Sequence, residues 1–415
     1  MKILVVGTNT ASDYISQKLL EDDRVEKIYH VGAHHTKFPS ERYIPEKFKK
    51  DELLEYIRKN HKEIDLIIPT VLYFQLWSEF NYVVRNKQIP ILMPNHKLGM
   101  LEWSKVTGKK LLTHLNIPTP PYRVLNKTEL TNEFHSIKRP YVIKYEQDWR
   151  HGLQTIVITD DNVDKEYRDF VNAPESMYPA TNNDEQATFL VEEFVKGVRE
   201  YSWHAICNIT GWRYLGTSRD YKKRYENDVG HNTASMGSYS PVPDVDAKIN
   251  DYAQSIVDFL IRRGTPYVGI LYLGIMIDED GTPVVLEINT RPGSPEIESI
   301  IPTIKTNLLD IFHATATNAP IPEIEFNERS AVSIRIVNQT YNEEVASSDL
   351  KFVMPKLWPL TGDVVMSMGN KANLLHSLLT VEDDNIDAAA DQLYKFLKNK
   401  TMGNFTYRTD IGYFK

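Results

Sequence analysis

The chain has 415 residues, of which 25% are charged and 41% hydrophobic, and its formal net charge is −8. This composition is typical of a globular protein of two to four domains, and the negative charge argues against a protein that binds the phosphate backbone of nucleic acids. The single cysteine, Cys207, excludes an intrachain disulfide. Because no apolar run is long enough for a signal peptide or a membrane span, the sequence predicts a cytoplasmic protein without a membrane partner.

The first hundred residues alternate between segments typical of strands and segments typical of helices. Such alternation with short loops predicts a parallel sheet with helices on both faces, and sheets of this kind bind ligands at the carboxyl ends of their strands. The predicted strands are 2–6, 28–31, 64–68 and 89–93, and the predicted helices are 12–20, 51–60 and 74–86.

The loop after the first strand, Gly7–Ser12, contains a single glycine. Since the dinucleotide-binding fingerprint needs three spaced glycines, the sequence disfavours a nicotinamide-dependent dehydrogenase. We interpret Ser12 as the N-cap of the following helix. The alternative is a small anion held by the hydroxyls of the loop and the N-terminus of that helix.

A basic amphipathic helix is predicted for residues 102–115, with Lys105, Lys109 and Lys110 on one face. The proline cluster at 116–121 ends this helix, because proline lacks the amide proton that a helix interior needs. We interpret the cluster as the entrance to a second domain.

The next predicted strand, 139–144, ends in Lys144, and another strand follows at 155–158. A lysine at the end of a strand can reach the phosphates of a nucleotide as a point charge, although many such lysines are simply solvated. The segment 189–195 is apolar, then acidic, then apolar, and a Lys-Gly turn follows it.

Residues 218–241 are polar and are predicted to form a long loop. The segment begins with basic residues and continues with small ones, so its backbone amides would approach an anionic ligand closely. Long ordered loops are usually functional, whereas the alternative is a flexible surface loop. The remaining predicted elements are a helix at 248–263, strands at 267–277 and 283–289, a mostly helical segment at 297–317, a strand at 331–337 and a helix at 385–397.

Asp280-Gly281 predicts a turn just before the strand 283–289. This predicted strand carries Glu287 and Asn289 two positions apart, so both side chains point to the same face. A carboxylate and an amide oxygen are hard ligands of the kind that Mg²⁺ takes, with waters and nucleotide phosphates completing its shell. Arg291 would follow on this face if the strand continued, where it could meet a phosphate oxygen. The alternative is a solvent-facing strand that ends in a Pro/Gly loop.

Four features together resemble the ATP-grasp fold. They are a lysine before the domain entrance (Lys105), a lysine that ends a strand (Lys144), the acidic segment 189–195, which would be a hinge, and the strand with Glu287 and Asn289. The whole chain resembles the phosphoribosylamine–glycine ligase family, also called glycinamide ribonucleotide synthetases. The motif blocks that carry this resemblance are Asp220–Arg224, Asn232–Pro241, Gly269–Asp278, Glu287–Glu296 and Arg408–Gly412.

The resemblance implies a multidomain protein of mixed α/β and α+β class. It implies an N-terminal parallel α/β domain at 1–103 and a central ATP-grasp domain at 104–324, of which 120–192 would be the mobile lid over ATP. A small mixed α/β domain would follow at 325–415.

The resemblance also implies ATP and Mg²⁺ (or Mn²⁺) as cofactors and assigns their contacts. Lys105 and Lys144 would contact the phosphates, and Glu200 would hold the ribose hydroxyls. The hinge, whose backbone would meet the adenine, would consist of Glu192, Glu193, Phe194 and Val195. The metal would be held by Glu287 and Asn289, and the candidate catalytic residues are Arg291, Lys144, Asp220 and Lys222, with Arg291 facing the γ-phosphate.

Four stretches and one single residue depart from the motifs of the family. Its first loop resembles G-N-G-G-R-E-H-A, which helps to hold phosphoribosylamine, and here it is Gly7–Tyr14 without the arginine, glutamate or histidine. Its G-P-E is here Pro69–Val71, and its glycine-rich loop over ATP is here Asp148–Gln154 with one glycine. Its N-T-G-G-M-G has become Asn232–Gly237, and Ser294 replaces the aspartate before Pro295.

The predicted function is an ATP-dependent carboxylate–amine ligase that forms an amide through an acyl phosphate. Its partners would be small molecules, an amino acid such as glycine and an amine, and the chain would be a monomer or a homodimer. Since the ATP apparatus is mostly retained and the amine loops are altered, the chain is either a divergent glycinamide ribonucleotide synthetase or a paralogue with another amine. The alternative from another class is an ATP-binding regulatory protein without catalysis.

Overall fold

The computed structural model describes residues 1–32, 40–146, 155–172, 188–243, 245, 247–339, 365–368, 375–398, 400 and 404–413. The chain forms two compact units, each of which contains segments that are distant in the sequence. Unit 1 comprises Met1–Gly99, Tyr201–Tyr272 and Asn289–Lys415, and unit 2 comprises Met100–Glu200 and Leu273–Ile288. The three domain ranges predicted from the sequence stay a prediction.

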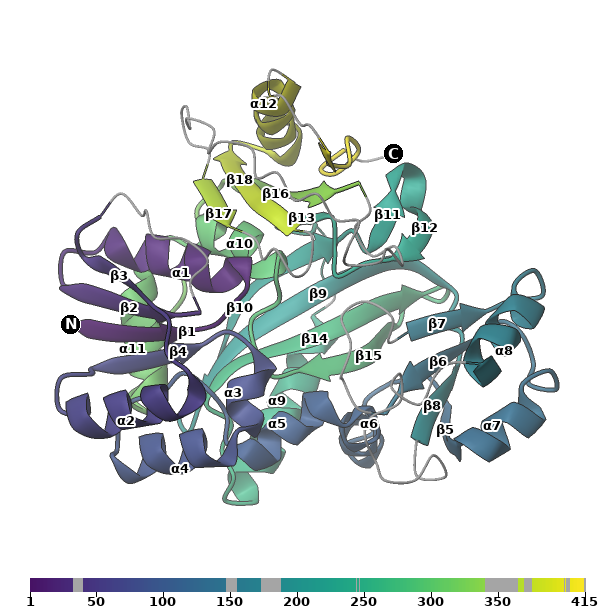
Figure 1. Cartoon of the computed structure of the whole chain (residues 1–415). Coiled ribbons are helices and arrows are strands. Elements are labelled where there is room, and N and C mark those ends of the chain that lie inside the picture. Colours follow the sequence, from purple (N-terminus) through teal and green to yellow (C-terminus); the bar gives the residue numbers. More distant parts are fainter. Residues whose placement is uncertain are drawn as a thin grey trace. The chain divides into compact units, whose positions relative to one another are not determined.

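Unit 1 begins with the predicted parallel sheet, whose strands lie in the order β3-β2-β1-β4 (Figure 1). Alternate residues of β1 pack on opposite faces: Ile3 and Val5 join a core with helix α1, and Leu4 and Val6 join a core with α2 and α4. The elements are β1 (Lys2–Val6), α1 (Thr10–Leu20), β2 (Lys27–Val31), β3 (Tyr43–Glu46), α2 (Lys50–Asn60), β4 (Leu66–Pro69), α3 (Leu72–Leu76) and α4 (Ser78–Asn86).

Three local predictions in this part are wrong. Residues 89–93 form only an isolated bridge, Ile67 to Ile91, and the fourth strand is instead β3. The helix predicted for 74–86 is interrupted at Trp77, whose backbone is extended. The N-cap of α1 is Asn9 rather than Ser12, because the Asn9 side chain accepts a hydrogen bond from the Ser12 backbone amide at 3.1 Å.

The rest of unit 1 contains antiparallel strands in the order β9-β10-β13-β16-β18-β17, with β19 paired to β16. The predicted helices at 248–263 and 385–397 and the predicted strand at 331–337 are confirmed, and the segment 297–317 is helical in three pieces. The elements are β9 (Gly197–Asn208), β10 (Gly211–Asp220), β13 (Gly237–Ser240), α9 (Lys248–Arg262), α10 (Glu296–Ile300), a 3₁₀ turn (Ile301–Thr303), α11 (Leu308–Ala316), β16 (Ser330–Asn338), β17 (Val365–Met368), β18 (Leu375–Asp383), α12 (Ile386–Lys398) and β19 (Phe405–Thr406).

The segment 218–241 is not the long loop that its polarity suggested. It contains the end of β10, a hairpin of β11 (Lys223–Tyr225) and β12 (Val229–Asn232), and all of β13. Strand β13 pairs with β10 on one side and β16 on the other, and its four residues are buried although two are serines. Polar side chains are tolerated there because they are hydrogen-bonded: the Ser238 hydroxyl donates to the Pro295 carbonyl at 2.8 Å.

Unit 2 is built on an antiparallel sheet in the order β5-β8-β6-β7. Its core contains Leu125, Phe134, Tyr141, Phe170 and Phe189. The elements are α5 (His96–Trp103), α6 (Lys105–His114), β5 (Tyr122–Asn126), α7 (Lys127–Glu133), β6 (Tyr141–Tyr145), β7 (Thr155–Ile158), α8 (Val163–Asn172), β8 (Thr188–Glu193), β14 (Gly269–Asp278) and β15 (Pro283–Asn289), of which α5, β14 and β15 run across the boundary with unit 1.

The helix predicted for 102–115 is two helices that meet at Ser104. The Ser104 hydroxyl accepts a hydrogen bond from the Thr107 amide at 3.0 Å and so caps α6. This break places Lys105 at the first position of α6. The turn predicted before β15 is confirmed, since the Gly281 amide donates to the Asp278 carbonyl at 3.1 Å.

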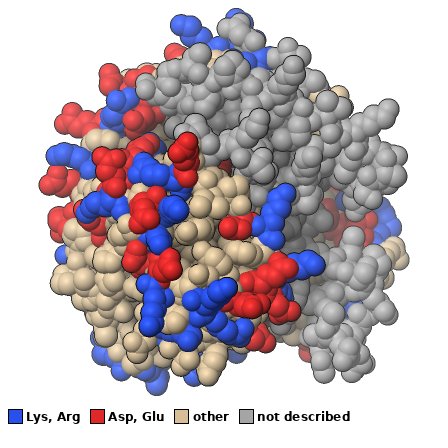
Figure 2. All heavy atoms as spheres, turned by 60° about the vertical axis from the view of Figure 1, so that its left-hand side comes forward, with Lys and Arg blue, Asp and Glu red and all other residues tan. Residues whose placement is uncertain are grey.

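The surface carries charges of both signs, as the face in Figure 2 shows, where Lys and Arg side chains are interspersed with Asp and Glu. In the part of the chain that the structure describes, no helix is both long and apolar enough to cross a bilayer.

Candidate active site

A small pocket in unit 2 is lined by three lysines, one glutamate and apolar side chains. The lining residues are Leu101, Lys105, Gly108, Lys109, Leu112, Lys144, Leu190, Leu286, Glu287 and Ile288. They come from α5, α6, β6, β8 and β15, so the pocket exists only when these elements are packed together. Its positive charge and apolar walls suit a ligand with an anionic part and an apolar part.

Lys105 and Lys144, the two lysines predicted to contact phosphates, both line this pocket. Lys105 Nζ lies 3.2 Å from Glu287 Oε2. Lys144 Nζ lies 2.8 Å from Glu192 Oε2 and donates to the Leu286 carbonyl at 3.4 Å. One lysine begins a helix and the other is near the end of a strand, so only the fold brings them together.

Lys109 is a third lysine of the pocket that the sequence analysis placed on the basic helix face but not in the site. Its side chain is 3% exposed, and its Nζ lies 2.9 Å from Glu192 Oε1 and 2.7 Å from Thr119 Oγ1. Burial, together with the charge of Lys144, lowers the pKa of Lys109 to about 8. The spacing of four residues from Lys105 on one helix was the signal for it.

The predicted hinge begins with the last two residues of β8, Glu192 and Glu193, and continues into the segment before β9. Glu192 is buried with its carboxylate between Lys109 and Lys144, whereas Glu193 and Phe194 are exposed. Val195 and Glu200 are half-buried. Residues 194–196 belong to no strand, so their backbone groups are not committed to a sheet.

Glu287 and Asn289 lie two positions apart on β15, as predicted, with Glu287 half-buried and Asn289 3% exposed. Gly274 on β14 makes room for Glu287: a Cβ atom at Gly274 would lie 3.1 Å from Glu287 Cγ. The strand ends at Asn289, so Arg291 does not continue on its face, contrary to the arrangement considered from the sequence.

Arg291, Asp220 and Lys222 belong to unit 1. Arg291 lies in the loop before α10 and donates to the Pro292 carbonyl at 3.2 Å. Burial, with the charge of Arg291, lowers the pKa of His204 to about 3, so the imidazole is neutral. Asp220 ends β10, Lys222 immediately precedes β11, and both are half-buried.

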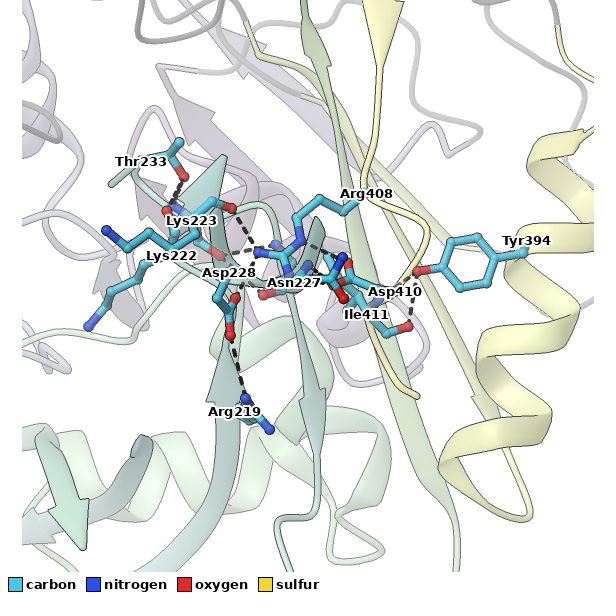
Figure 3. A network of polar contacts seen from close by, with 12 residues as sticks. Arg219, Lys222, Lys223, Asn227, Asp228, Thr233, Tyr394, Arg408, Asp410 and Ile411 are labelled. Carbon is cyan, nitrogen blue, oxygen red and sulfur yellow. Dashed lines mark hydrogen bonds and ion pairs between the residues drawn. The ribbon is translucent and has the colours of Figure 1, made fainter. Parts of the chain in front are cut away.

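Two of the motif blocks that suggested the resemblance contact each other in unit 1 (Figure 3). Arg408, from the C-terminal block, is 2% exposed and donates to both carboxylate oxygens of Asp410, at 2.8 and 2.7 Å. It also donates to the carbonyl of Lys223 at 2.8 Å and to Asp228 Oδ1 at 3.0 Å. The end of the chain is thereby tied to the β11–β12 hairpin, next to Lys222.

Three positions at which the chain departs from the family motifs also meet. Thr10 Oγ1 lies 2.8 Å from Ser294 Oγ, and both hydroxyls bond Glu298 Oε1, at 2.6 and 2.9 Å. Arg335 donates to the Ser294 carbonyl at 2.7 Å and to the Ala234 carbonyl at 2.8 Å. Burial raises the pKa of the Glu298 carboxyl to about 7. The loop predicted to cover ATP, Asp148–Gln154, lies outside the described residues.

The sequence of this chain is similar to a known family model and to several known enzymes. Residues 103–297 match the family model of the phosphoribosylglycinamide synthetase ATP-grasp (A) domain. A phosphoribosylamine–glycine ligase of Streptomyces coelicolor is 29% identical over 350 residues, which are 79% of this chain and 79% of the relative. The enzyme of the same name from Streptococcus pyogenes serotype M1 is 26% identical over 440 residues, which cover 99% of each chain.

Solved structures agree on the fold. The crystal structure of phosphoribosylamine–glycine ligase from Thermotoga maritima has a TM-score of 0.77 at 20% identity, covering 99% of this chain and 100% of that one. Biotin carboxylase from Campylobacter jejuni has a TM-score of 0.71 at 14% identity, covering 99% and 94%. The predicted fold class and the predicted resemblance are therefore confirmed.

Proposed function

We propose that this chain, an ATP-grasp protein related to phosphoribosylamine–glycine ligases, is an ATP-dependent ligase that joins the carboxylate of an amino acid to an amine. The observation that supports this most directly is the pocket in which Lys105, Lys109, Lys144 and Glu287 come together within the matched region. The substrates are small molecules, with glycine as the proposed acid. A cytoplasmic location and a monomeric or homodimeric state remain expectations.

In this proposal the triphosphate of ATP lies against Lys105 and Lys144, whose ammonium groups offset its charge. Glu192 to Val195 contribute backbone groups to the adenine, and Glu200 holds the ribose hydroxyls. Residues 194–196 belong to no strand, which supports the hinge assignment, because their amides and carbonyls are outside a sheet ladder and can meet a purine edge.

Glu287 and Asn289 are the proposed ligands of Mg²⁺ or Mn²⁺. Their side-chain oxygens fit the preference of these hard cations. The described residues contain no group of three or more His, Cys, Asp or Glu that could hold a metal, so phosphates and waters would complete the shell. The metal, when bound, supplies charge neutralisation at the phosphates. Lys105 Nζ lies 3.2 Å from Glu287 Oε2 and so holds this carboxylate on the pocket side.

The reaction proceeds in two steps. The acid's carboxylate oxygen attacks the γ-phosphorus of ATP, so that the bond to the β–γ bridging oxygen breaks and ADP leaves. The amine nitrogen then attacks the acyl carbon, the C–O bond to phosphate breaks, and an amide, phosphate and a proton result. Arg291 faces the transferred phosphoryl group, and Asp220 and Lys222 belong to the same catalytic set. Catalysis is mainly positioning and charge neutralisation.

The proposal has two forms, which differ in the amine that the enzyme uses. One form takes phosphoribosylamine, as the names of the relatives state for those enzymes. The other form takes a different amine, and the contact between Thr10 and Ser294 favours it, because the side chains at these two altered motif positions both bond Glu298.

Coupled ADP release with Mg-ATP and glycine tests the proposal, with freshly made phosphoribosylamine present, absent or replaced by other amines, and with mass spectrometry of the product. A glycinamide ribonucleotide product supports the first form. Turnover that ignores phosphoribosylamine and responds to another amine supports the second. ATP binding without turnover for any acid–amine pair would contradict both and would favour an ATP-binding regulatory protein.

A further inference from the structure

Glu192 is the only carboxylate among the described residues that pairs with two buried lysines of the pocket. Its Oε1 lies 2.9 Å from Lys109 Nζ and its Oε2 lies 2.8 Å from Lys144 Nζ. The side chains of Lys109, Lys144 and Glu192 are 3%, 7% and 2% exposed, so solvent screens these charges little. Short contacts between buried charges of this kind are ion pairs whose attraction water weakens little.

Lys109 also makes a second contact, with Thr119. It donates to the Thr119 hydroxyl at 2.7 Å, and that hydroxyl donates to the Val285 carbonyl on β15 at 2.7 Å. Lys109 therefore connects α6 with β8, through Glu192, and with β15, through Thr119. Glu287, the proposed metal ligand, is two residues after Val285 on the same strand.

We propose that Lys109 is a positioning residue that neutralises the charge of Glu192 and holds its side chain in place. As a result, the positive charge of Lys144 is not cancelled by Glu192, and Lys144 can bind the phosphates of the nucleotide. This inference rests on the proposed ATP-dependent function and adds a residue to it. Lys109 has no assigned contact with the ligand in this proposal and acts through Glu192.

The physical reason is the charge balance of the three buried groups. With both lysines protonated, the Lys109–Glu192–Lys144 set carries a net charge of +1. Without Lys109, Glu192 and Lys144 form a neutral buried pair, and Lys144 offers less attraction to a phosphate. Water does not replace the lost charge of Lys109, because the Glu192 side chain is only 2% exposed.

The charge state of Lys109 gives the proposal a readout that a purely structural lysine lacks. The groups that face Lys109 are Glu192, Lys144 and Glu287, with Lys105 one turn earlier on its own helix. The pKa of Lys109 is lowered to about 8. As the pH rises through this value Lys109 loses its proton, so the affinity for ATP is expected to fall between pH 7 and pH 9.

The test measures ATP binding by calorimetry from pH 7 to pH 9 for the full-length protein, Lys109→Met, Lys109→Arg and a control, Lys110→Met. Lys110 is the exposed neighbour on the same helix, so the control removes an equal charge outside the pocket. Circular dichroism verifies the fold of each variant. We expect Lys109→Met to bind ATP about tenfold more weakly at pH 7 and to lose the pH dependence, while Lys110→Met keeps both the affinity and the profile.

Lys109→Arg keeps its charge at pH 9, because a guanidinium does not titrate there, so its profile is expected to be flat. A Lys109→Met protein that binds ATP with unchanged affinity and pH profile overturns the inference while leaving the proposed function intact. If Lys109→Met does not fold, a Lys109→Arg protein whose affinity still falls near pH 8 overturns it. Failure of the unmodified protein to bind ATP overturns the proposed function and this inference together.

Discussion

Thr10 and Ser294, which are 284 residues apart in the sequence, lie 2.8 Å apart through their hydroxyl oxygens. Thr10 begins helix α1, and Ser294 is in the loop between β15 and α10. Both hydroxyls bond the fully buried carboxyl of Glu298, which Arg335 attracts electrostatically. Two departures from the family motifs are thus one structural feature, and the carboxyl group at its centre leads to the first prediction.

Glu298→Gln is expected to change the pH dependence of stability. The pKa of Glu298 is raised to about 7 in the folded protein from its ordinary value of 4.5, so the folded state holds the proton more tightly than the unfolded state. The tighter proton binding adds to the free energy of unfolding, by about 3 kcal/mol at most. This stabilisation is complete below about pH 4.5 and is lost as the pH rises to about 7.

Urea unfolding of the two proteins at pH 5 and pH 8 measures this effect. The variant should gain stability relative to the unmodified protein between these pH values. Other groups titrate in both proteins, including His204, whose lowered pKa acts in the opposite direction, so the comparison cancels them. An equal difference in unfolding free energy at pH 5 and pH 8 would mean that Glu298 does not titrate in this range.

Glu287→Gln is expected to abolish Mg²⁺-dependent ADP release while leaving the fold intact. The amide keeps the size of the side chain and removes the charge that Mg²⁺ needs and that Lys105 holds at 3.2 Å. ADP release, measured across a range of Mg²⁺ concentrations, should fall by at least about 100-fold, roughly 2.7 kcal/mol in activation free energy. Full activity in this variant would remove Glu287 from the proposed metal site.

Gly274→Ala is expected to reduce the same activity by moving Glu287 rather than by replacing it. The added methyl group would lie 3.1 Å from Glu287 Cγ, closer than an ordinary contact, so the glutamate has to shift by a few tenths of an ångström. We expect about a tenfold loss of turnover, with a weaker Mg²⁺ dependence. Affinity for ATP without metal serves as the control and should change little, because the lysines are untouched.

Arg408→Met is expected to destabilise the protein by about 1.5–3 kcal/mol, because it removes the hydrogen bonds that a buried guanidinium makes with the carboxylates of Asp410 and Asp228 (Figure 3). Arg219→Met is the matched control: it removes a 3.7 Å contact with the same Asp228 from a side chain that is 37% exposed. The control should lower the free energy of unfolding by less than about 1 kcal/mol. Similar losses for the two variants in urea unfolding would contradict the structural importance of Arg408.

Much of this protein was predictable from short windows of sequence. Glu287 and Asn289 share a face because strand side chains alternate, and their strand was recognisable from its β-forming residues and the Asp-Gly turn before it. The parallel N-terminal sheet followed from the alternation of strands and helices, and the order of the motif blocks carried the resemblance that the comparisons confirmed. These features depend on local periodicity and spacing, which a sequence displays directly.

Other features were decided only by tertiary structure. Lys109 and Lys110 are adjacent and have the same charge, yet only Lys109 is buried against Glu192, because α6 packs its face against β8. Residues 218–241 look like a loop, yet pairing of β13 with β10 and β16 satisfies their backbone and buries their polar side chains. The Thr10–Ser294 contact has no local signal at all. Burial and charge pairing depend on which distant segments meet, and the free energy of those contacts is not encoded in any single window of the chain.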